Sequence, residues 1–301
     1  MRLTRLVTDY LLGWIVLAVL AGVVFPPLAG ITRFSTPILV VMVGSTALLL
    51  SVDDVRSVNR RVLSGILLAH GVMPVLAFGI ARSLGLPPAI TAGFVLLGAV
   101  TPELVSPTMT ALADGDVALS SISLVTIGVV SVGYVPAIVP GLLGGTVHVA
   151  GGRLVTELLI AVVLPMALAI FARSRYERVV ARYDNYYPAV AAVMVVLIIG
   201  GVAAANASLL RGSQLVLLTV VGTLSLNVLG YGLGWTATSL AGGTPRERTA
   251  GTFAVGMRDF AVAAALVVAS GFPAAAALPA VCFGIVEMAT SAGLARLTRA
   301  R

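Results

Sequence analysis

Ten apolar stretches of about 20 residues fill most of this chain, and short connections rich in arginine separate them. Each stretch is long enough to cross the hydrocarbon layer of a bilayer as a helix. With 59% hydrophobic and 10% charged residues and a mean hydropathy of +1.07, the composition excludes an ordinary soluble domain. We therefore expect an all-α polytopic membrane protein with ten transmembrane helices. The stretches lie near residues 10–29, 36–52, 62–81, 86–113, 117–143, 154–172, 187–207, 213–240, 249–270 and 273–295.

The basic residues predict how the chain is oriented. All 19 are arginines, of which 14 fall in connections on one side of the predicted membrane and four on the other. Because positive charge favours the cytoplasmic side, we expect both termini in the cytoplasm, with the protein in the inner or plasma membrane of the cell. Arg2 and Arg5 before the first stretch also fit a signal peptide, but nine more stretches follow, so we interpret the first as a retained span. The arginines form no basic face for a nucleic acid, and the lipid bilayer is the expected surrounding.

Two of the stretches are interrupted in the middle. The first contains Pro102 and Pro107, which remove two backbone donors and predict a break over residues 101–107. The second carries Gly256, Arg258 and Asp259 within an apolar stretch. Irregular backbone at membrane depth is tolerated only where it is buried in protein or lines a cavity. Interrupted segments at corresponding positions of two halves indicate the binding site of a secondary transporter.

The ten stretches divide into two sets of five. An odd number of spans per set makes the second half enter the membrane upside down, and in this division each broken stretch is the fourth of its half. We therefore predict a single membrane domain, 1–301, built from two inverted five-helix repeats, 1–145 and 146–301, whose fourth and ninth helices are broken and cross. The longest polar connection is about 15 residues, which leaves no room for a separate soluble domain.

Glu103 and Arg258 are the charged groups that most need an explanation. A carboxylate at the depth of Glu103 costs about 2.5–3.5 kcal/mol, so it either caps the following half-helix or couples transport to an ion. Arg258 stays charged at any accessible pH and must meet an anion, either Asp259, Glu103 or a substrate. Two interpretations stay open: an internal salt bridge that ties the broken helices together, or contact with a substrate anion.

Other polar groups lie at membrane depth. Pro107 disfavours helical backbone at Ser106 and frees its hydroxyl. Asn227 fits an interhelical hydrogen bond or a substrate contact, while His70 and Glu287 fit either structural hydrogen bonds or an ion path. Cys282 is the single cysteine, and no enzyme or metal-ligand motif is present. The candidate substrate-binding residues are Arg258, Asp259, Ser106, Pro107, Thr108 and Asn227, and the candidate ion-coupling residues are Glu103, Ser106, Ser120, His70 and Asp259.

Several stretches resemble a known family. The run from Ser106 to Ser120, SPTMTALADGDVALS, resembles the fourth-helix motif of the bile acid:sodium symporter family. Three further stretches match in the same order along the chain. His70–Pro74 and Asn227–Tyr231 are weak alone, while Val255–Met257 followed by Ala261–Leu266 is fairly specific. The resemblance implies ten helices in a panel domain and a core domain, with the fourth and ninth helices unwound where they cross. It also implies transport of organic anions such as bile acids, pantoate, pyruvate-like acids or sulfated steroids, usually with sodium, while related branches export arsenite.

The chain departs from that family at its sodium sites. Sodium-coupled members have glutamate, glutamine and asparagine where this chain has Ala254, Arg258 and Asp259. This chain also has Pro107 where those members have an asparagine, Leu124 where they have a threonine, and Leu226 where many have a histidine. Of the hydroxyl groups that bind sodium in the family, those of Ser106 and Ser120 remain. An arginine in place of a ligand repels sodium. The cysteine and the glutamate typical of the arsenite branch are missing at the matching positions.

We therefore hypothesise that Arg258 stands in for a mobile sodium ion. The predicted function is secondary active transport of a small organic anion by alternating access, with no enzymatic activity and no cofactor. Sodium coupling is doubtful on this interpretation, and the coupling ion is either Na⁺ or H⁺ or absent, as in a uniporter. The alternatives are a membrane receptor or sensor that binds a metabolite without moving it, and an arsenite-type exporter.

Overall fold

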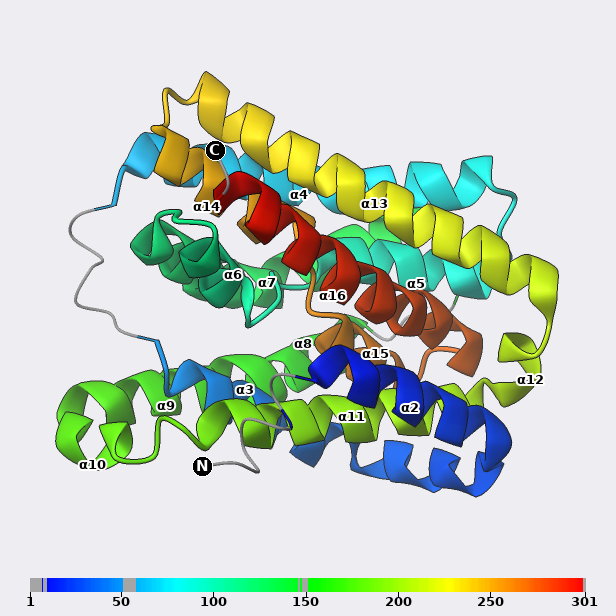
Figure 1. Ribbon diagram of the computed structural model, residues 1–301. Coiled ribbons are helices and arrows are strands. Elements are labelled where there is room, and N and C mark those ends of the chain that lie inside the picture. The colour runs from blue at the N-terminus through cyan, green and yellow to red at the C-terminus, as the bar shows by residue number, and fades with distance from the viewer. Residues whose placement is uncertain (1–6, 8–9, 51–57, 146, 148–150, 300–301) are drawn as a thin grey trace.

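The computed structural model describes residues 7, 10–50, 58–145, 147 and 151–299, and every regular element in that part of the chain is helical (Figure 1). The all-α prediction is thus confirmed. The elements, with 3₁₀ and π segments labelled η, are α2 (Leu11–Val24), η1 (Pro26–Phe34), α3 (Ser35–Ala47), α4 (Arg60–Ser83), α5 (Pro88–Ala99), α6 (Ser106–Leu112), α7 (Val117–Leu143), α8 (Gly151–Leu158), η3 (Leu159–Val163), α9 (Leu164–Arg175), α10 (Glu177–Ala181), α11 (Tyr187–Ala205), α12 (Ala207–Leu210), α13 (Ser213–Leu240), α14 (Pro245–Gly256), α15 (Phe260–Ala269), η4 (Ala274–Ala277) and α16 (Leu278–Arg299).

Eight helical segments in the described residues are long and apolar enough to cross a membrane. Two further apolar helices, Leu11–Val24 and Pro88–Ala99, are shorter. The first is shorter than its predicted stretch because Pro26 and Pro27 follow it, and a helix usually ends before the residue that precedes a proline. The helices therefore support a polytopic helical membrane protein, and the number of ten spans remains a prediction.

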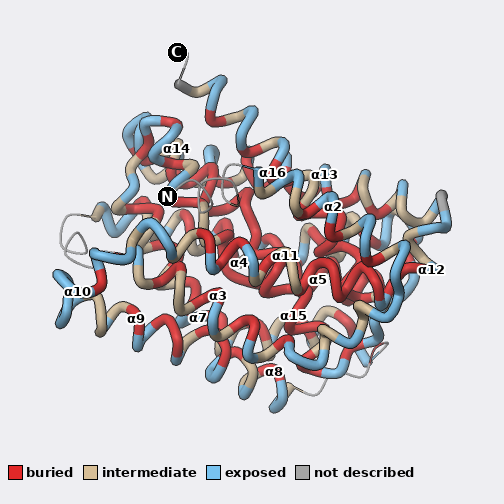
Figure 2. Tube along the Cα trace, turned by 60° about the horizontal axis from the view of Figure 1, so that its bottom comes forward, coloured by how far each residue is buried: buried red, intermediate tan, exposed pale blue. Residues whose placement is uncertain are grey.

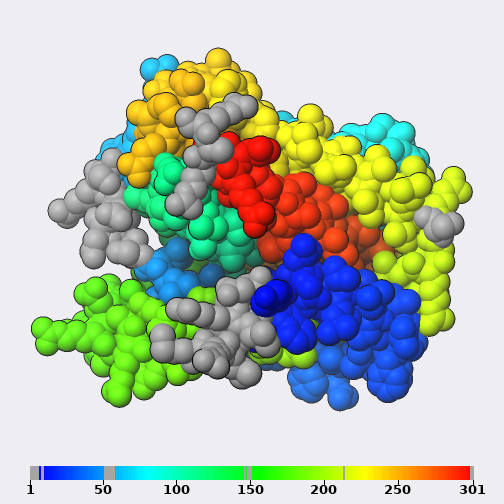
Figure 3. Space-filling model, viewed as in Figure 1, coloured from blue at the N-terminus to red at the C-terminus, as the bar shows by residue number. Residues whose placement is uncertain are grey.

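The helices form two layers (Figure 1). In the lower layer of that view α2, η1 and α3 pack around α11, and α9 packs against α3. In the upper layer α4, α5, α7, α14 and α16 pack around one another and α13. The element α15 lies between them and contacts α3 and α11 on one side and α5 and α16 on the other. The space-filling view shows the amino-terminal helices of the lower layer against the orange and red surface of α16 (Figure 3).

The deepest parts of the fold are the half-helices. Every residue of α5 from Ile90 to Ala99 is buried, and so is α15 from Phe260 to Val267, as the red tube of Figure 2 shows. Neither half-helix has a polar face, because protein surrounds each of them on all sides. The two broken segments therefore run through the centre of the molecule.

Glycines allow α13 and α14 to pack closely. A Cβ added at Gly230 would lie 2.9 Å from the Cα of Gly256, and one added at Gly234 would collide with the backbone of Gly251. Gly230 and Gly234 are four residues apart and thus form a small-residue face on α13 against α14. This packing places the end of α14, where the second break begins, directly against α13.

The connections after α6 and before α14 lie on one side of the molecule, since the N–H of Asp116 donates to the carbonyl of Arg246 at 3.0 Å. This agrees with the predicted orientation, which puts both connections in the cytoplasm. The arginines Arg2, Arg5, Arg56 and Arg301, which also contribute to that prediction, lie outside the described residues.

Candidate functional site

The first broken segment runs from α5 into α6 and is irregular over residues 100–105. Pro102 lies inside the irregular part and has no N–H to donate. The helix resumes at Ser106, with Pro107 in its first turn, a position where a missing N–H removes no helical bond. The predicted break is confirmed, since no continuous helix passes through 101–107, and Pro107 lies in the first turn of the second half-helix.

The second broken segment changes direction in only three residues, 257–259. Met257 is extended, with φ −88° and ψ 136°, directly after Gly256. The tip of Tyr231 fills the space where a Cβ would lie on Gly256, so glycine is required there. Asp259 then caps α15, because its Oδ1 accepts from the N–H of Val262 at 2.8 Å.

The two breaks contact each other through their backbones. The N–H of Asp259 donates to the carbonyl of Thr101 at 3.0 Å. The guanidinium of Arg258 donates to the carbonyl of Val100 at 3.3 Å. The two breaks therefore provide hydrogen-bond partners for each other. Buried irregular backbone needs such partners for its free N–H and C=O groups.

Arg258 is completely buried and anchored by neutral acceptors. One terminal nitrogen lies 2.6 Å from Nδ1 of His70, and the other donates to the carbonyl of Val255 at 2.9 Å. A guanidinium has only donors, so Nδ1 of His70 must accept and carries no proton. The Nε of Arg258 has no partner among the described residues. The arginine is therefore a fixed positive charge with one nitrogen, Nε, that has no partner in the described structure.

The predicted salt bridge of Arg258 is wrong. Within the described residues one ion pair has its charged atoms within 4.0 Å of each other. It joins Arg173 to Asp184 and does not involve Arg258. Neither Asp259 nor Glu103 comes that close to the guanidinium, because Asp259 turns to cap α15. The arginine instead uses backbone carbonyls that the two breaks leave free.

Three carboxylates surround the breaks. Glu103, Asp259 and Glu287 are 5%, 1% and 0% exposed, and each has one oxygen without a hydrogen-bond partner in the described structure. Glu287 on α16 accepts from the backbone N–H of Arg258 at 3.1 Å. The three groups lie close enough for their charges to repel one another. If all three were ionised, the one arginine among them would leave two negative charges without a countercharge inside this cluster.

The hydroxyls of the first break differ in their surroundings. Ser106 is wholly buried and its Oγ has no partner in the described structure, although its backbone is helical, against expectation. Ser120 accepts from Thr110 at 3.3 Å, and Thr110 also donates to the carbonyl of Ser106 at 2.8 Å. Thr108 is exposed on the outer side of α6. The structure thus brings Ser106 and Ser120 near each other and leaves Thr108 apart.

Asn227 holds the end of α14. Its Nδ2 donates to the carbonyl of Gly256 at 3.1 Å, and its Oδ1 accepts from Thr290 at 2.7 Å. The hydroxyl of Tyr231 lies 3.4 Å from Thr290. Both ends of the Asn227 amide are therefore engaged with α14 and α16, which is the interhelical hydrogen bond that the sequence predicted.

Two residues of α16 belong to this site and were not among the predicted site residues. Glu287 was recognisable as a lone carboxylate in the last apolar stretch, but nothing in the sequence connected it with Arg258 on another helix. Thr290 gave no signal, because a threonine in a membrane helix usually bonds to its own backbone. It does so here too, while also reaching Asn227.

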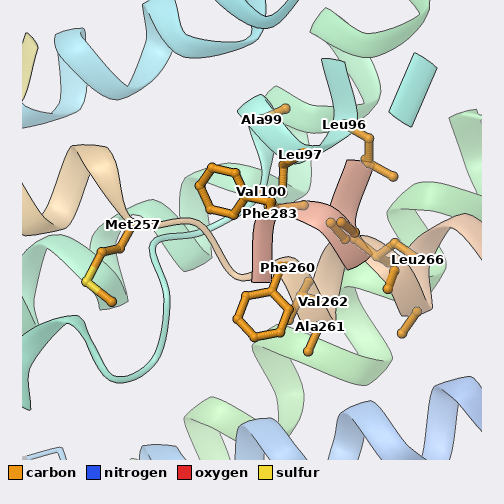
Figure 4. Close-up of a cluster of buried hydrophobic side chains, with 14 of the residues drawn as sticks. Leu96, Leu97, Ala99, Val100, Met257, Phe260, Ala261, Val262, Leu266 and Phe283 are labelled. Carbon is orange, nitrogen blue, oxygen red and sulfur yellow. The ribbon is translucent and has the colours of Figure 1, made fainter. Parts of the chain in front are cut away.

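Apolar side chains enclose the polar centre. Figure 4 shows Leu96, Leu97 and Val100 facing Phe260, Val262 and Phe283 across the two breaks. Phe260 and Phe283 are 1% and 0% exposed. No group of three or more His, Cys, Asp or Glu side chains in the described part of the chain is placed to hold a metal ion. The polar centre is therefore enclosed by protein in this conformation.

Comparison with known proteins adds an independent finding. The profile of the Sodium Bile acid symporter family matches residues 36–213. A Bacillus subtilis (strain 168) protein described as "uncharacterized sodium-dependent transporter YocS" is 29% identical over 280 residues, 90% of this chain and 85% of its own length.

Plant proteins match over a shorter range. The probable sodium/metabolite cotransporter BASS1, chloroplastic, of Arabidopsis thaliana is 30% identical over 187 residues, which is 60% of this chain and 47% of that protein. BASS3 of Oryza sativa subsp. japonica, described in the same words, is 31% identical over 59% of this chain and 43% of its own length. The chain thus spans less than half of either plant protein in these matches. The relatives are transporters and not enzymes.

Proposed function

The chain belongs to the sodium bile acid symporter family, and on that premise we propose that it moves a small organic anion across the membrane at the crossed breaks without using sodium. The family and the apolar helices identify a transporter embedded in the membrane. The cargo, the coupling ion and the mechanism are our proposal. It rests above all on the surroundings of Arg258.

Arg258 occupies a site built like a sodium site. Transporters coordinate sodium with the carbonyl oxygens of unwound helices, and the guanidinium here takes the carbonyls of Val100 and Val255, one from each broken segment. A charge fixed to the chain cannot leave with the cargo. The protein therefore has the positive charge that an anion needs without drawing it from a sodium gradient.

The unbalanced carboxylates supply the alternative coupling. Glu103, Asp259 and Glu287 together with Arg258 would carry a net charge of two negatives if all were ionised, and burying such charges is costly. Binding a proton relieves that cost. Each of the three carboxylates has one oxygen without a partner in the described structure. We assign the transported proton to Glu103 because it belongs to the first break, whereas Asp259 caps α15 and Glu287 holds the backbone N–H of Arg258 in the second.

Cargo binding requires the centre to open. Arg258 is 0% exposed, so an anion reaches its unused Nε only after the layers move apart. Ser106, with a free hydroxyl beside the first break, is the second proposed contact. Asn227 has both amide ends engaged, so we assign it the role of positioning α14 instead of binding cargo.

The architecture supports alternating access between inverted repeats. The proposed first half, 1–145, places α2 and α3 in the lower layer and α4 to α7 in the upper layer. The proposed second half, 146–301, does the same with α9 and α11 below and α13, α14 and α16 above, while α15 lies between the layers. Because each half contributes a broken segment to the centre, rocking of one layer against the other would expose that centre first to one side of the membrane and then to the other.

The test is flux into proteoliposomes. A thermal-shift screen with pyruvate, pantoate and taurocholate first identifies an acid that stabilises the protein, since a ligand of the folded state raises the unfolding temperature. Uptake of that acid is then measured with an inward sodium gradient, an inward proton gradient or neither. We expect uptake and counterflow that ignore sodium and increase with the proton gradient. Flux that follows sodium strictly would overturn the proposal, and binding without counterflow would make the protein a receptor.

A further inference from the structure

A second cavity lies away from the crossed breaks. It has a volume of about 720 Å³ and lies between α13, α14 and the last turns of α16. The helix α14 is the first half of the second broken segment. Figure 1 shows these three elements together beside the carboxyl end of the chain. The cavity is at the end of the molecule that the arginine distribution predicts to be cytoplasmic. Its lining is mostly apolar, with one charged side chain, Arg248.

Arg248 is positioned but unpaired. Its Nε donates to the carbonyl of Gly243 at 2.9 Å, and its guanidinium carbon lies 6.0 Å from the centre of the Trp235 ring. No described carboxylate lies within 4.0 Å of it. The terminal nitrogens of the guanidinium therefore present donors to the cavity, which calls for an anion.

The cavity opens onto lipid-facing surface. The outward face of α13 is a row of exposed apolar residues, and two of them, Val228 and Trp235, also line the cavity. Leu297 of α16 lines it from the other side and is 68% exposed. In a membrane this mouth faces acyl chains, and a tryptophan beside an arginine is typical of the level of the lipid headgroups.

We propose that this cavity binds an anionic phospholipid, with the phosphate on Arg248 and an acyl chain along Val228 and Leu297. A phosphate gives the guanidinium its missing acceptor, and an acyl chain fills apolar space that the protein leaves open. A soluble glycerol phosphate shares the headgroup chemistry but not the chain, so it should bind far more weakly.

The bound lipid would act on the second break. Tyr231 and Thr290 line the cavity, and they are also the partners that connect Asn227 with the carbonyl of Gly256. A lipid packed against both residues therefore restrains the end of α14. The site is thus a place where the lipid composition of the membrane can influence the transporter.

The experiment measures lipid binding by native mass spectrometry and thermal unfolding in a neutral detergent. The probes are palmitoyl-oleoyl phosphatidylglycerol, the matched phosphatidylcholine and sn-glycerol 3-phosphate. We expect phosphatidylglycerol to bind wild type at least about tenfold more tightly than phosphatidylcholine and to raise its unfolding temperature, while glycerol phosphate has no effect.

Three variants localise the effect. Arg248→Gln should lose the preference for phosphatidylglycerol, whereas Arg246→Gln, the exposed neighbouring arginine outside the cavity, should keep it. Gly293→Leu fills the cavity from α16, where a Cβ meets nothing within 4 Å, and should lose lipid binding without disturbing Arg248 or the fold. The proposal is overturned if the two lipids bind alike, if glycerol phosphate suffices, or if Arg246→Gln matters as much as Arg248→Gln.

Discussion

The two broken segments solve the same problem in opposite ways. The second break is short, and its charged side chains serve the backbone: Arg258 takes two free carbonyls and Asp259 caps α15. The first break is longer, and Glu103 and Ser106 each have an atom without a partner in the described structure. In the second break Nε of Arg258 and Oδ2 of Asp259 also lack a partner there, but the other polar atoms of both side chains hold backbone groups. The comparison teaches that one break holds the centre together while the other has groups available for ions and cargo.

Replacing Arg258 by Met is the strongest way to break this comparison. The variant leaves the carbonyls of Val100 and Val255 and Nδ1 of His70 without their donor, and each buried acceptor costs about 1–3 kcal/mol. We expect a loss of about 3–5 kcal/mol in unfolding free energy and no transport. Thermal unfolding in detergent measures the first, with Arg246→Met as an exposed control. A variant as stable as the control would show that the arginine does not hold the breaks.

Asp259 tests the same division with a smaller effect. Asp259→Ala removes the cap on the N–H of Val262 and should destabilise the protein by about 0.5–2 kcal/mol. Asp259→Asn should restore most of that loss, because asparagine caps almost as well as aspartate. Chemical or thermal unfolding of both variants provides the comparison, and equal losses would contradict the capping role.

In contrast to Asp259, Glu103 should matter for transport and not for stability. Glu103→Gln removes a buried charge whose Oε2 has no partner in the described structure, so we expect unchanged or slightly higher stability. Flux should lose its response to an inward proton gradient, while exchange of labelled for unlabelled acid continues. Proteoliposome uptake with and without the gradient measures both. A proton response that survives in Glu103→Gln would move the proton to another group.

Ser106→Ala should have the smallest effect on stability. The hydroxyl is buried without a partner in the described part of the chain, so its removal should change the unfolding free energy by less than about 1 kcal/mol. If Ser106 contacts the cargo, the apparent affinity for the acid should fall although the fold is intact. An unfolding curve and a concentration series of uptake separate the two effects, and a large loss of stability would mean that the hydroxyl has a structural role.

Much of this arrangement could be predicted from the sequence because it depends on local rules. Prolines and a glycine within apolar stretches predicted both breaks, and the length of the stretches predicted the helices. What failed was pairing at a distance. The partners expected for Arg258 were acids, since charge is visible in a sequence, whereas a carbonyl freed by a break 158 residues earlier in the chain is not. The link from Glu287 to Arg258 was missed for the same reason, as it depends on how α16 packs.

The position of Pro107 shows a further limit. A proline can interrupt a helix or begin one, and only the conformation of the preceding residues decides between the two. Here the irregular part ends before Ser106, so Pro107 lies in the first turn of α6 and the backbone of Ser106 is helical, against expectation. The existence of an element was thus more predictable than its boundary.

The most direct test of the central claim, that Arg258 takes the place of a sodium ion, is thermal unfolding of the purified protein in sodium chloride and in choline chloride at equal ionic strength. The account predicts the same unfolding temperature in both salts for wild type, because the carbonyls of Val100 and Val255 are already occupied. It predicts stabilisation by sodium only in Arg258→Gln, which frees them. The account would be contradicted if sodium raised the unfolding temperature of the wild type in a saturable manner and by as much as it raised that of Arg258→Gln.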